Sequence, residues 1–132
     1  MIRAVVSKKD GDNGNEVRIK IKGDGTFGTI IGFDFVQAQA FLVRDNDGTA
    51  TDIMDGAPRD AYNTNRTALV PMDGRKVTLL IYVDWNSIEV FINHGISSLS
   101  SLIYPNSNSE IIQITSDNDT LSLDSFDYIN IN

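Results

Sequence analysis

The sequence predicts an all-β fold, a two-sheet antiparallel β-sandwich of the lectin or jelly-roll kind. The first observation is the frequency of Asp-Gly and Asn-Gly pairs, which tolerate the positive φ that tight hairpin turns require. The second is that short runs rich in Val, Ile, Phe, Tyr and Thr lie between these pairs, several of them alternating strictly between apolar and polar residues. The third is that no segment keeps the apolar spacing of a helix. Many short strands joined by regular turns are typical of a sandwich or a barrel.

The expected strands follow these runs in chain order. "EVRIKIK", for example, alternates between apolar and charged residues, as an antiparallel strand with one solvated face does. A long irregular loop is expected at 44–66, where turn-forming residues crowd together, and loops of this length usually have a function or wrap over a neighbour. The strands are expected at residues 16–22, 26–33, 36–43, 76–83, 87–92, 98–104, 110–115 and 120–131.

The last expected strand changes phase within itself. Leu121 and Leu123 share one face, whereas Phe126 and Tyr128 have the opposite parity. A β-bulge, which inserts one extra residue into a strand, produces such a shift. We therefore predict a bulge near residues 124–125.

Composition and charge exclude several classes of function. The 132 residues are enough for one domain, and 18 acidic against 11 basic side chains give a net charge of −7. That balance disfavours nucleic acid and anionic membranes as partners. No apolar run approaches the ~20 residues that span a bilayer, and the N-terminal run is too short for a signal peptide. There is no Cys and one histidine, His94, which excludes disulfides, thiolate chemistry and Cys- or His-rich metal sites.

We expect no metal and no cofactor. The run "DNDG" at 45–48 begins like a calcium loop, but its glycine comes too early for an EF-hand. It is interpreted as a turn, as is "SDNDT" at 116–120, before the final strand.

The most informative stretch is "LLIYVDWNSIEVFINHG", residues 79–95. If residues 85–86 form a two-residue turn, the register of the two strands on either side is fixed. One face is then apolar, with the pairs Leu79–Ile92, Ile81–Val90 and Val83–Ile88. The other face is mixed, with the pairs Leu80–Phe91, Tyr82–Glu89 and Asp84–Ser87.

Two carboxylates, Asp84 and Glu89, become diagonal neighbours on the mixed face, ~7 Å apart between Cβ atoms. Retaining glycosidases hold their carboxyl groups ~5 Å apart and inverting ones hold them farther apart, so this geometry alone allows catalysis. Any charged strand produces such pairs, however, and no partner residues form a cleft. The pattern therefore favours carboxylates that satisfy backbone and hydroxyl donors near a turn.

The segment "IYVDWNSIEVFINHGISSLSSLIYP" resembles the signature of the C-terminal β-sandwich domain of glycoside hydrolase family 32, the levanases, inulinases, fructanases and invertases. The upstream "GTIIGFD" and "FLVRD" are similar to further strands of that family. The resemblance covers residues 16–130, and its specific part is 79–105. Trp85 stands where the family usually has Arg, and His94 stands where it commonly has Asp. The matching positions are Tyr82, Val83, Asp84, Ser87, Glu89, Val90, Phe91, Asn93, Gly95, Ser101, Tyr104 and Pro105.

This resemblance implies that residues 1–132 form one C-terminal β-sandwich domain, with a five-bladed catalytic propeller expected upstream. The family's chemistry resides in that propeller, in the motifs "NDPNG", "RDP" and "EC", and none of these occurs here. No catalytic residue is therefore expected in this chain. The motif positions expected to serve the scaffold are Asp84, Ser87, Glu89, Phe91, Asn93 and Gly95.

The expected function is that of a non-catalytic module of a fructan- or sucrose-hydrolysing enzyme, packing on and stabilising the propeller of the same polypeptide, with a homodimer of the parent left open. The alternative is an autonomous fructan-binding module. In either case Trp85, Tyr82 and Tyr104 are the candidate contacts to a sugar or to the propeller. The alternative is that Trp85 caps the edge of the core and that the two tyrosines are core or interface residues. A third hypothesis, a small glycosidase that uses Asp84 and Glu89, is disfavoured. The turn-rich, cysteine-free composition favours a secreted or cell-surface bacterial enzyme over a cytoplasmic one.

Overall fold

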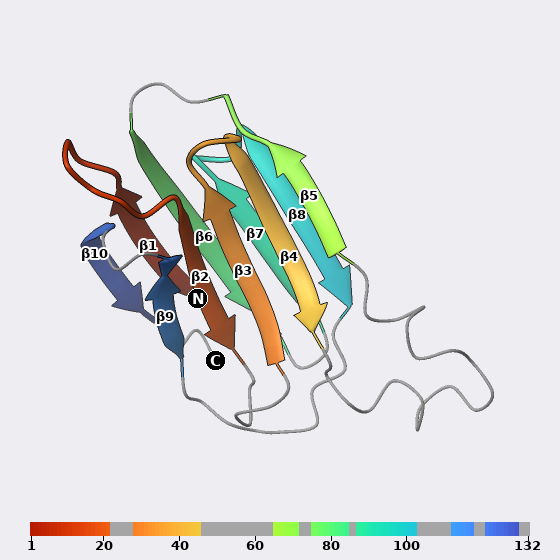
Figure 1. The fold of residues 1–132 in the computed structure, drawn as a ribbon. Helices are drawn as coiled ribbons and strands as arrows, with labels where there is room; N and C mark the ends of the chain where they lie inside the picture. Colours follow the sequence, from red (N-terminus) through yellow and green to blue (C-terminus); the bar gives the residue numbers. More distant parts are fainter. Residues whose placement is uncertain are drawn as a thin grey trace.

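The fold is a stack of two antiparallel β-sheets, seen in a computed structural model (Figure 1). The structure describes residues 1–21, 28–45, 65–71, 75–84, 87–102, 112–117 and 121–129. Sheet A has the strand order β10 (Ser122–Tyr128), β1 (Ile2–Ser7), β6 (Lys76–Val83), β7 (Ser87–Ile92) and β8 (Ser97–Leu102). Sheet B has the order β5 (Asn65–Leu69), β4 (Gln39–Asp45), β3 (Gly28–Asp34), β2 (Glu16–Ile21) and β9 (Gln113–Ser116).

One hydrophobic core lies between the two sheets. Both sheets contribute side chains that alternate along their strands, because successive residues of a strand point to opposite faces. The described buried hydrophobic side chains, Val5 excepted, belong to a single cluster, so the predicted two-sheet sandwich is confirmed. Its fully buried large members include Phe33, Ile31 and Leu42 from sheet B and Leu79, Ile81 and Ile92 from sheet A.

The predicted β-bulge is present in β10. Val5 of β1 pairs with Ser125, but the next residue, Val6, pairs with Leu123, which leaves Asp124 as the extra residue. The Ser7 hydroxyl donates a hydrogen bond to the Asp124 carboxylate at 3.1 Å. The bulge thus shifts the strand by one residue, as the change of phase predicted.

Several sequence expectations need correction, among them the absence of a strand at β5 and the extent of β10, expected over 120–131. The first to be explained is the start of β4. This strand begins at residue 39, not at 36. The Asp34 carboxylate accepts hydrogen bonds from the N–H groups of Val36 at 2.8 Å and Gln37 at 3.0 Å. This side chain therefore folds the following residues into a turn, and the apolar Val36 lies 70% exposed within it.

The second correction concerns β1, which was not expected as a strand. β1 lies between β10 and β6 in sheet A, and "IRAVVS" does not alternate clearly because the four residues after Arg3 are all buried. Even Val5, whose parity places it on the outer face, is only 7% exposed. A strand covered on both faces loses the two-residue period that identifies half-buried strands.

The third correction concerns the ends of the expected loop at 44–66. Arg44 and Asp45 pair with β3 as the end of β4, and residues 65–66 pair with β4 as the start of β5. The remainder of that loop, 46–64, lies outside the described residues. The part of the chain that is described contains no helix long and apolar enough to cross a membrane.

Candidate functional site

The hairpin of β6 and β7 has the register that the sequence predicted. The Asp84 N–H donates a hydrogen bond to the Ser87 carbonyl oxygen at 2.9 Å, which closes the last of the predicted pairs. Residues 85–86, the expected turn, lie outside the described part of the chain. The strand pairs are Leu79–Ile92, Leu80–Phe91, Ile81–Val90, Tyr82–Glu89 and Val83–Ile88.

Asn93 closes the other end of this hairpin. Its side-chain oxygen accepts a hydrogen bond from the Thr78 N–H at 2.9 Å, and its own N–H donates to the Thr78 carbonyl oxygen at 2.9 Å. Asn93, His94 and Gly95 have φ of 50°, 62° and 89°, so the connection to β8 is a left-handed turn. Asn, His and Gly are among the residues that tolerate this region best, which accounts for their succession here. His94, in place of the family's Asp, keeps the turn.

A groove of about 280 Å³ lies on the outer face of sheet A, beside this turn. Two of its lining side chains, the rings of Tyr82 and Phe91, meet edge to face, with centroids 5.9 Å apart and planes at 82°. The groove is lined by Arg3, Thr78, Leu80, Tyr82, Phe91, His94 and Gly95.

Arg3 forms the charged wall of the groove. Its guanidinium lies 3.9 Å from the Asp127 carboxylate and donates a hydrogen bond to the Ser125 hydroxyl at 3.3 Å. Both partners belong to β10, so the guanidinium is held towards that edge of the sheet. Leu80, which pairs with Arg3 across the strands, and Phe91, which pairs with Leu80, continue the same row towards β8.

The two carboxylates that raised the question of catalysis, Asp84 and Glu89, are both exposed. Glu89 stands between Tyr82 and Ser100 on the open outer face of sheet A, and neither carboxylate lines the groove. A glycosidase needs its two carboxyl groups on either side of the bond to be cleaved, in a cleft that holds the sugar. The positions of Asp84 and Glu89 do not provide such a site.

Of the three candidate contacts to a sugar or to the propeller, the structure describes Tyr82. Tyr82 is half-buried and lines the groove, together with Phe91. Trp85 and Tyr104 lie outside the described residues. Arg3 and Thr78 also line the groove and were missed by the sequence reasoning. Thr78 could have been found from the predicted strand alternation, whereas Arg3 comes from a strand whose pattern is masked by burial on both faces.

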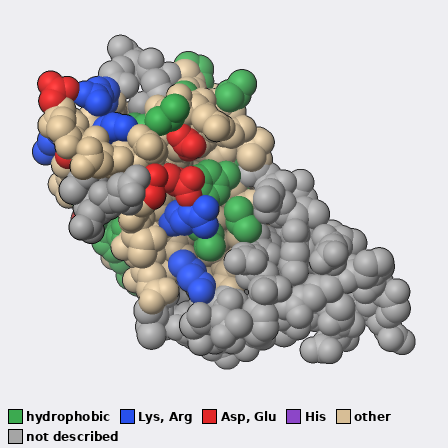
Figure 2. Space-filling view, in the orientation of Figure 1, with side chains coloured by type: hydrophobic (Ala, Val, Ile, Leu, Met, Phe, Trp, Pro, Cys, Tyr) green, Lys and Arg blue, Asp and Glu red, His purple; other side chains and the backbone are tan. Residues whose placement is uncertain are grey.

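The outer face of sheet B carries a different arrangement, and Figure 2 shows acidic, basic and hydrophobic side chains mixed over it. Gly32, without a side chain, lies beneath the ring of Phe41, since a Cβ placed on Gly32 would come within 2.0 Å of that ring. The Arg18 guanidinium lies over the same ring, 5.5 Å from its centroid. Arg18 also forms an ion pair with Glu16.

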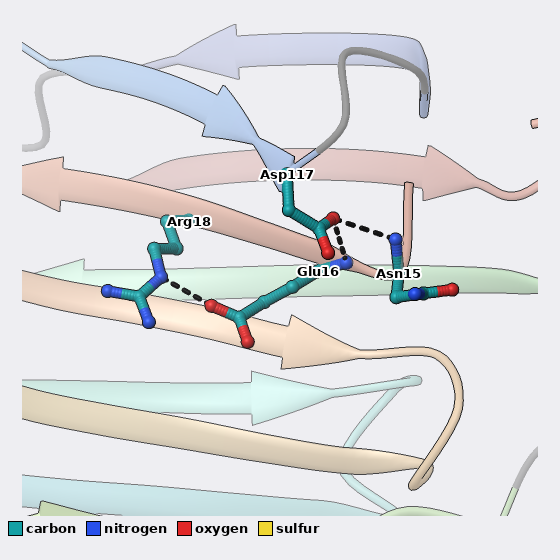
Figure 3. A network of polar contacts seen from close by, with 4 residues as sticks. All are labelled: Asn15, Glu16, Arg18 and Asp117. Atoms are coloured by element: carbon teal, nitrogen blue, oxygen red, sulfur yellow. Dashed lines mark hydrogen bonds and ion pairs between the residues drawn. The ribbon is translucent and has the colours of Figure 1, made fainter. Parts of the chain in front are cut away.

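Figure 3 shows how the start of β2 is tied to the residue that follows β9. The Asp117 carboxylate accepts hydrogen bonds from the backbone N–H groups of Glu16 and Asn15, each at 2.7 Å. The hydrogen bond from Glu16 is the main cause that holds the pKa of Asp117 below its ordinary value of 3.8. This contact joins two strands of one sheet, which is a structural role.

No group of three or more His, Cys, Asp or Glu side chains among the described residues is placed to hold a metal ion. Of the "DNDG" run, residues 46–48 lie outside the described part.

Comparison with known proteins gives the family. The model of the family described as "Glycosyl hydrolases family 32 C terminal" matches residues 2–130. The chain is 33% identical over 89 residues to the extracellular exo-inulinase inuE of Aspergillus niger, which covers 67% of this chain and 16% of that protein. It is 32% identical over 79 residues to the putative glycosyl hydrolase ecdE of Aspergillus rugulosus, covering 60% of this chain and 10% of the relative. The chain therefore spans only a small part of the curated relatives that it matches.

Solved structures agree with this fold. The exo-inulinase of Aspergillus awamori matches with a TM-score of 0.70 and 25% identity, over 92% of this chain and 23% of that one. A β-fructofuranosidase of Schwanniomyces occidentalis matches with a TM-score of 0.68 over 95% of this chain and 27% of that one, and at 18% identity it supports the fold alone.

The family match spans nearly the whole chain and names the C-terminal domain rather than the part that cleaves sugar. It agrees with the exposed carboxylates and with the absence of the family's catalytic motifs from the sequence. The chain belongs to glycosyl hydrolase family 32, as the non-catalytic C-terminal β-sandwich domain of that family.

Proposed function

We propose that this domain packs on a catalytic β-propeller in the same polypeptide and stabilises it, in an enzyme that hydrolyses fructan or sucrose. The observation that carries the proposal is the small share of each relative that the chain matches, 16% of the Aspergillus niger exo-inulinase. A domain that is a minor, non-catalytic part of the larger enzymes that it matches is expected to act through such an enzyme. The names of the relatives, exo-inulinase and β-fructofuranosidase, suggest the substrate class.

The second candidate is a module that binds fructan by itself. Its support is the presence of Tyr82 and Phe91 in a surface groove, because aromatic rings stack on sugars. The two rings stand at 82° to each other, however, so they do not form one flat platform for successive sugar rings. Docking of a protein surface fits this geometry better. Trp85 and Tyr104 remain proposed contacts for either function.

Truncation tests the docking function. The complete polypeptide is compared with a version that ends immediately before this domain, by thermal unfolding and by inulin and sucrose hydrolysis after heating. We expect the truncated enzyme to unfold at a lower temperature and to lose activity faster, because an interdomain interface stabilises both partners. Equal unfolding temperatures and equal survival would contradict the proposal.

Affinity electrophoresis in gels containing inulin or levan separates the two candidates. The free chain should migrate as it does without polysaccharide if its function is docking. Retardation that disappears in Trp85→Ala would instead establish a fructan-binding module. Size-exclusion chromatography of the complete enzyme tests whether the parent is a homodimer.

A further inference from the structure

The groove on sheet A has the composition of a protein–protein contact. Its lining combines the half-buried apolar and aromatic side chains of Leu80, Tyr82 and Phe91 with polar side chains, those of Arg3, Thr78 and His94. Interfaces commonly have an apolar, aromatic centre and a polar rim, with Tyr and Arg among the residues that contribute most to binding. Arg3 is the charged side chain of this lining. It already has Asp127 and Ser125 of β10 as partners.

The opposite face of the sandwich is covered by its own side chains. On sheet B the ring of Phe41 lies over Gly32, and the Arg18 guanidinium covers the other side of that ring. Arg18 is held in turn by Glu16. A partner that approached this ring would have to displace an ion pair first, whereas the rings of sheet A line an open groove.

The place where a preceding domain joins the chain also favours sheet A. The matching family model is described as C-terminal, so a catalytic domain that precedes it would be connected on the side of β1, a strand of sheet A. Met1 is fixed there by two hydrogen bonds with Ile129, of 2.7 Å and 2.8 Å. Arg3, two residues later, lines the groove. Ile129 lies beside this entry point with 46% of its surface exposed.

From these observations we propose that the outer face of sheet A, through the groove of Leu80, Tyr82 and Phe91, is the surface on which the catalytic domain of the same polypeptide docks. The inference rests on the docking function proposed above and identifies the face of this domain that contacts the catalytic domain. The groove's aromatic pair enters the interface, and the outer face of sheet B stays in solvent.

Cysteine accessibility tests the assignment, because the chain contains no cysteine of its own. Ser98→Cys places a thiol on β8, opposite Phe91 on the outer face of sheet A. Thr115→Cys is the matched control, on β9, opposite Arg18 on the outer face of sheet B. Both positions are exposed and both lie on edge strands. Ser100→Cys, exposed opposite Glu89, repeats the sheet A probe independently.

The rate of maleimide labelling is measured by peptide mass spectrometry in the complete polypeptide and in the free 132-residue chain. We expect Ser98→Cys and Ser100→Cys to be labelled roughly tenfold or more slowly in the complete polypeptide, since a partner that covers this face shields it from the reagent. Thr115→Cys should be labelled at the same rate in both.

The alternative outcomes overturn different statements. Protection of Thr115→Cys but not of the two sheet A probes would overturn the choice of face and leave the docking function standing. Labelling at equal rates at all three positions would overturn the docking function together with the face. If inulin or levan protects Ser98→Cys in the free chain, the groove binds sugar, and the catalytic domain is not its occupant.

Discussion

The two outer faces of this sandwich are built from the same kind of strand but differ in what they offer to a partner. On sheet B, a glycine opposite Phe41 lets the ring lie down on the sheet, and Arg18 covers it. On sheet A, Leu80 stands between Arg3 and Phe91, and the rings of Tyr82 and Phe91 line a groove. The difference comes from cross-strand neighbours rather than from the number of apolar residues. Whether an aromatic side chain of a strand is available to a partner therefore depends on the residues beside it on the neighbouring strands.

The largest expected effect is a difference in stability between substitutions at two adjacent positions of β6. One position lies in the core and the other on the outer face of sheet A. Leu79→Ala removes a fully buried side chain and should lower the free energy of unfolding by about 2–5 kcal/mol. Leu80→Ala, on the half-buried outer face, should cost less than about 1 kcal/mol in the free chain. Urea unfolding followed by circular dichroism measures both. Equal losses would mean that the outer face of sheet A is covered within this domain, and the contrast between the faces would fail.

The next effect concerns the closed face of sheet B. Gly32→Ala introduces a Cβ into the space occupied by the Phe41 ring, so the ring must move and lose its contacts with the sheet and with Arg18. We expect a loss of about 1–3 kcal/mol in the free energy of unfolding, as for other overpacked sites. The measurement is urea unfolding, as for the leucine variants.

A double-mutant cycle gives the control for this glycine. In a Phe41→Ala background the added Cβ has room, so Gly32→Ala should cost much less there. If the cost of Gly32→Ala is the same with and without the ring, Phe41 does not lie over Gly32, and sheet B has no self-covered face.

The hairpin shows how far sequence reasoning reaches when the constraints are local. A two-residue turn fixes every pair of β6 and β7, and all of the predicted strand pairs are present. The bulge in β10 was predictable for the same reason, because a change of parity within one strand is visible in the sequence. Both features depend on residues that are neighbours along the chain.

The features that were missed depend on distant residues. "NRTAL", the sequence of β5, has little β character, and it is a strand because β4 supplies its hydrogen bonds. The groove was not predicted either, since Arg3 reaches it only through the pairing of β1 with β6, more than seventy residues away. No local pattern indicates which strand will lie beside β6. The covering of Phe41 by Arg18 likewise appears only when β2, β3 and β4 are placed in register.

A smaller effect is expected at the turn that borders the groove of sheet A. Asn93→Ala removes the acceptor for the Thr78 N–H and places alanine at a φ of 50°, so we expect a loss of about 1 kcal/mol in the free energy of unfolding. Asn93→Asp keeps an oxygen acceptor and tolerates the same backbone region, so it should lose less. Thermal unfolding of the two variants gives the comparison. If alanine and aspartate behave alike, the side-chain oxygen does not hold the end of the hairpin.

The smallest effect is the pH dependence at the edge of sheet B. The backbone N–H groups of Glu16 and Asn15 donate to the Asp117 carboxylate, so its pKa is lower in the folded protein than the ordinary value of 3.8. A lowered pKa in the folded state means that the unfolded chain takes up the proton first as the pH falls. The contribution of Asp117 to stability is therefore fully present above the ordinary value and is lost as the pH falls towards the folded value.

Asp117→Asn should accordingly flatten the fall in stability below pH 3.8 while changing little near neutrality, where the amide oxygen can still accept a hydrogen bond. Urea unfolding as a function of pH measures the slope. The carboxylate is exposed, so solvent weakens the effect, and we expect it to be smaller than those of the other variants. Parallel pH profiles for the wild type and Asp117→Asn would mean that Asp117 does not tie β9 to β2. The covering of the outer face of sheet B would then depend on Arg18 and Phe41 alone.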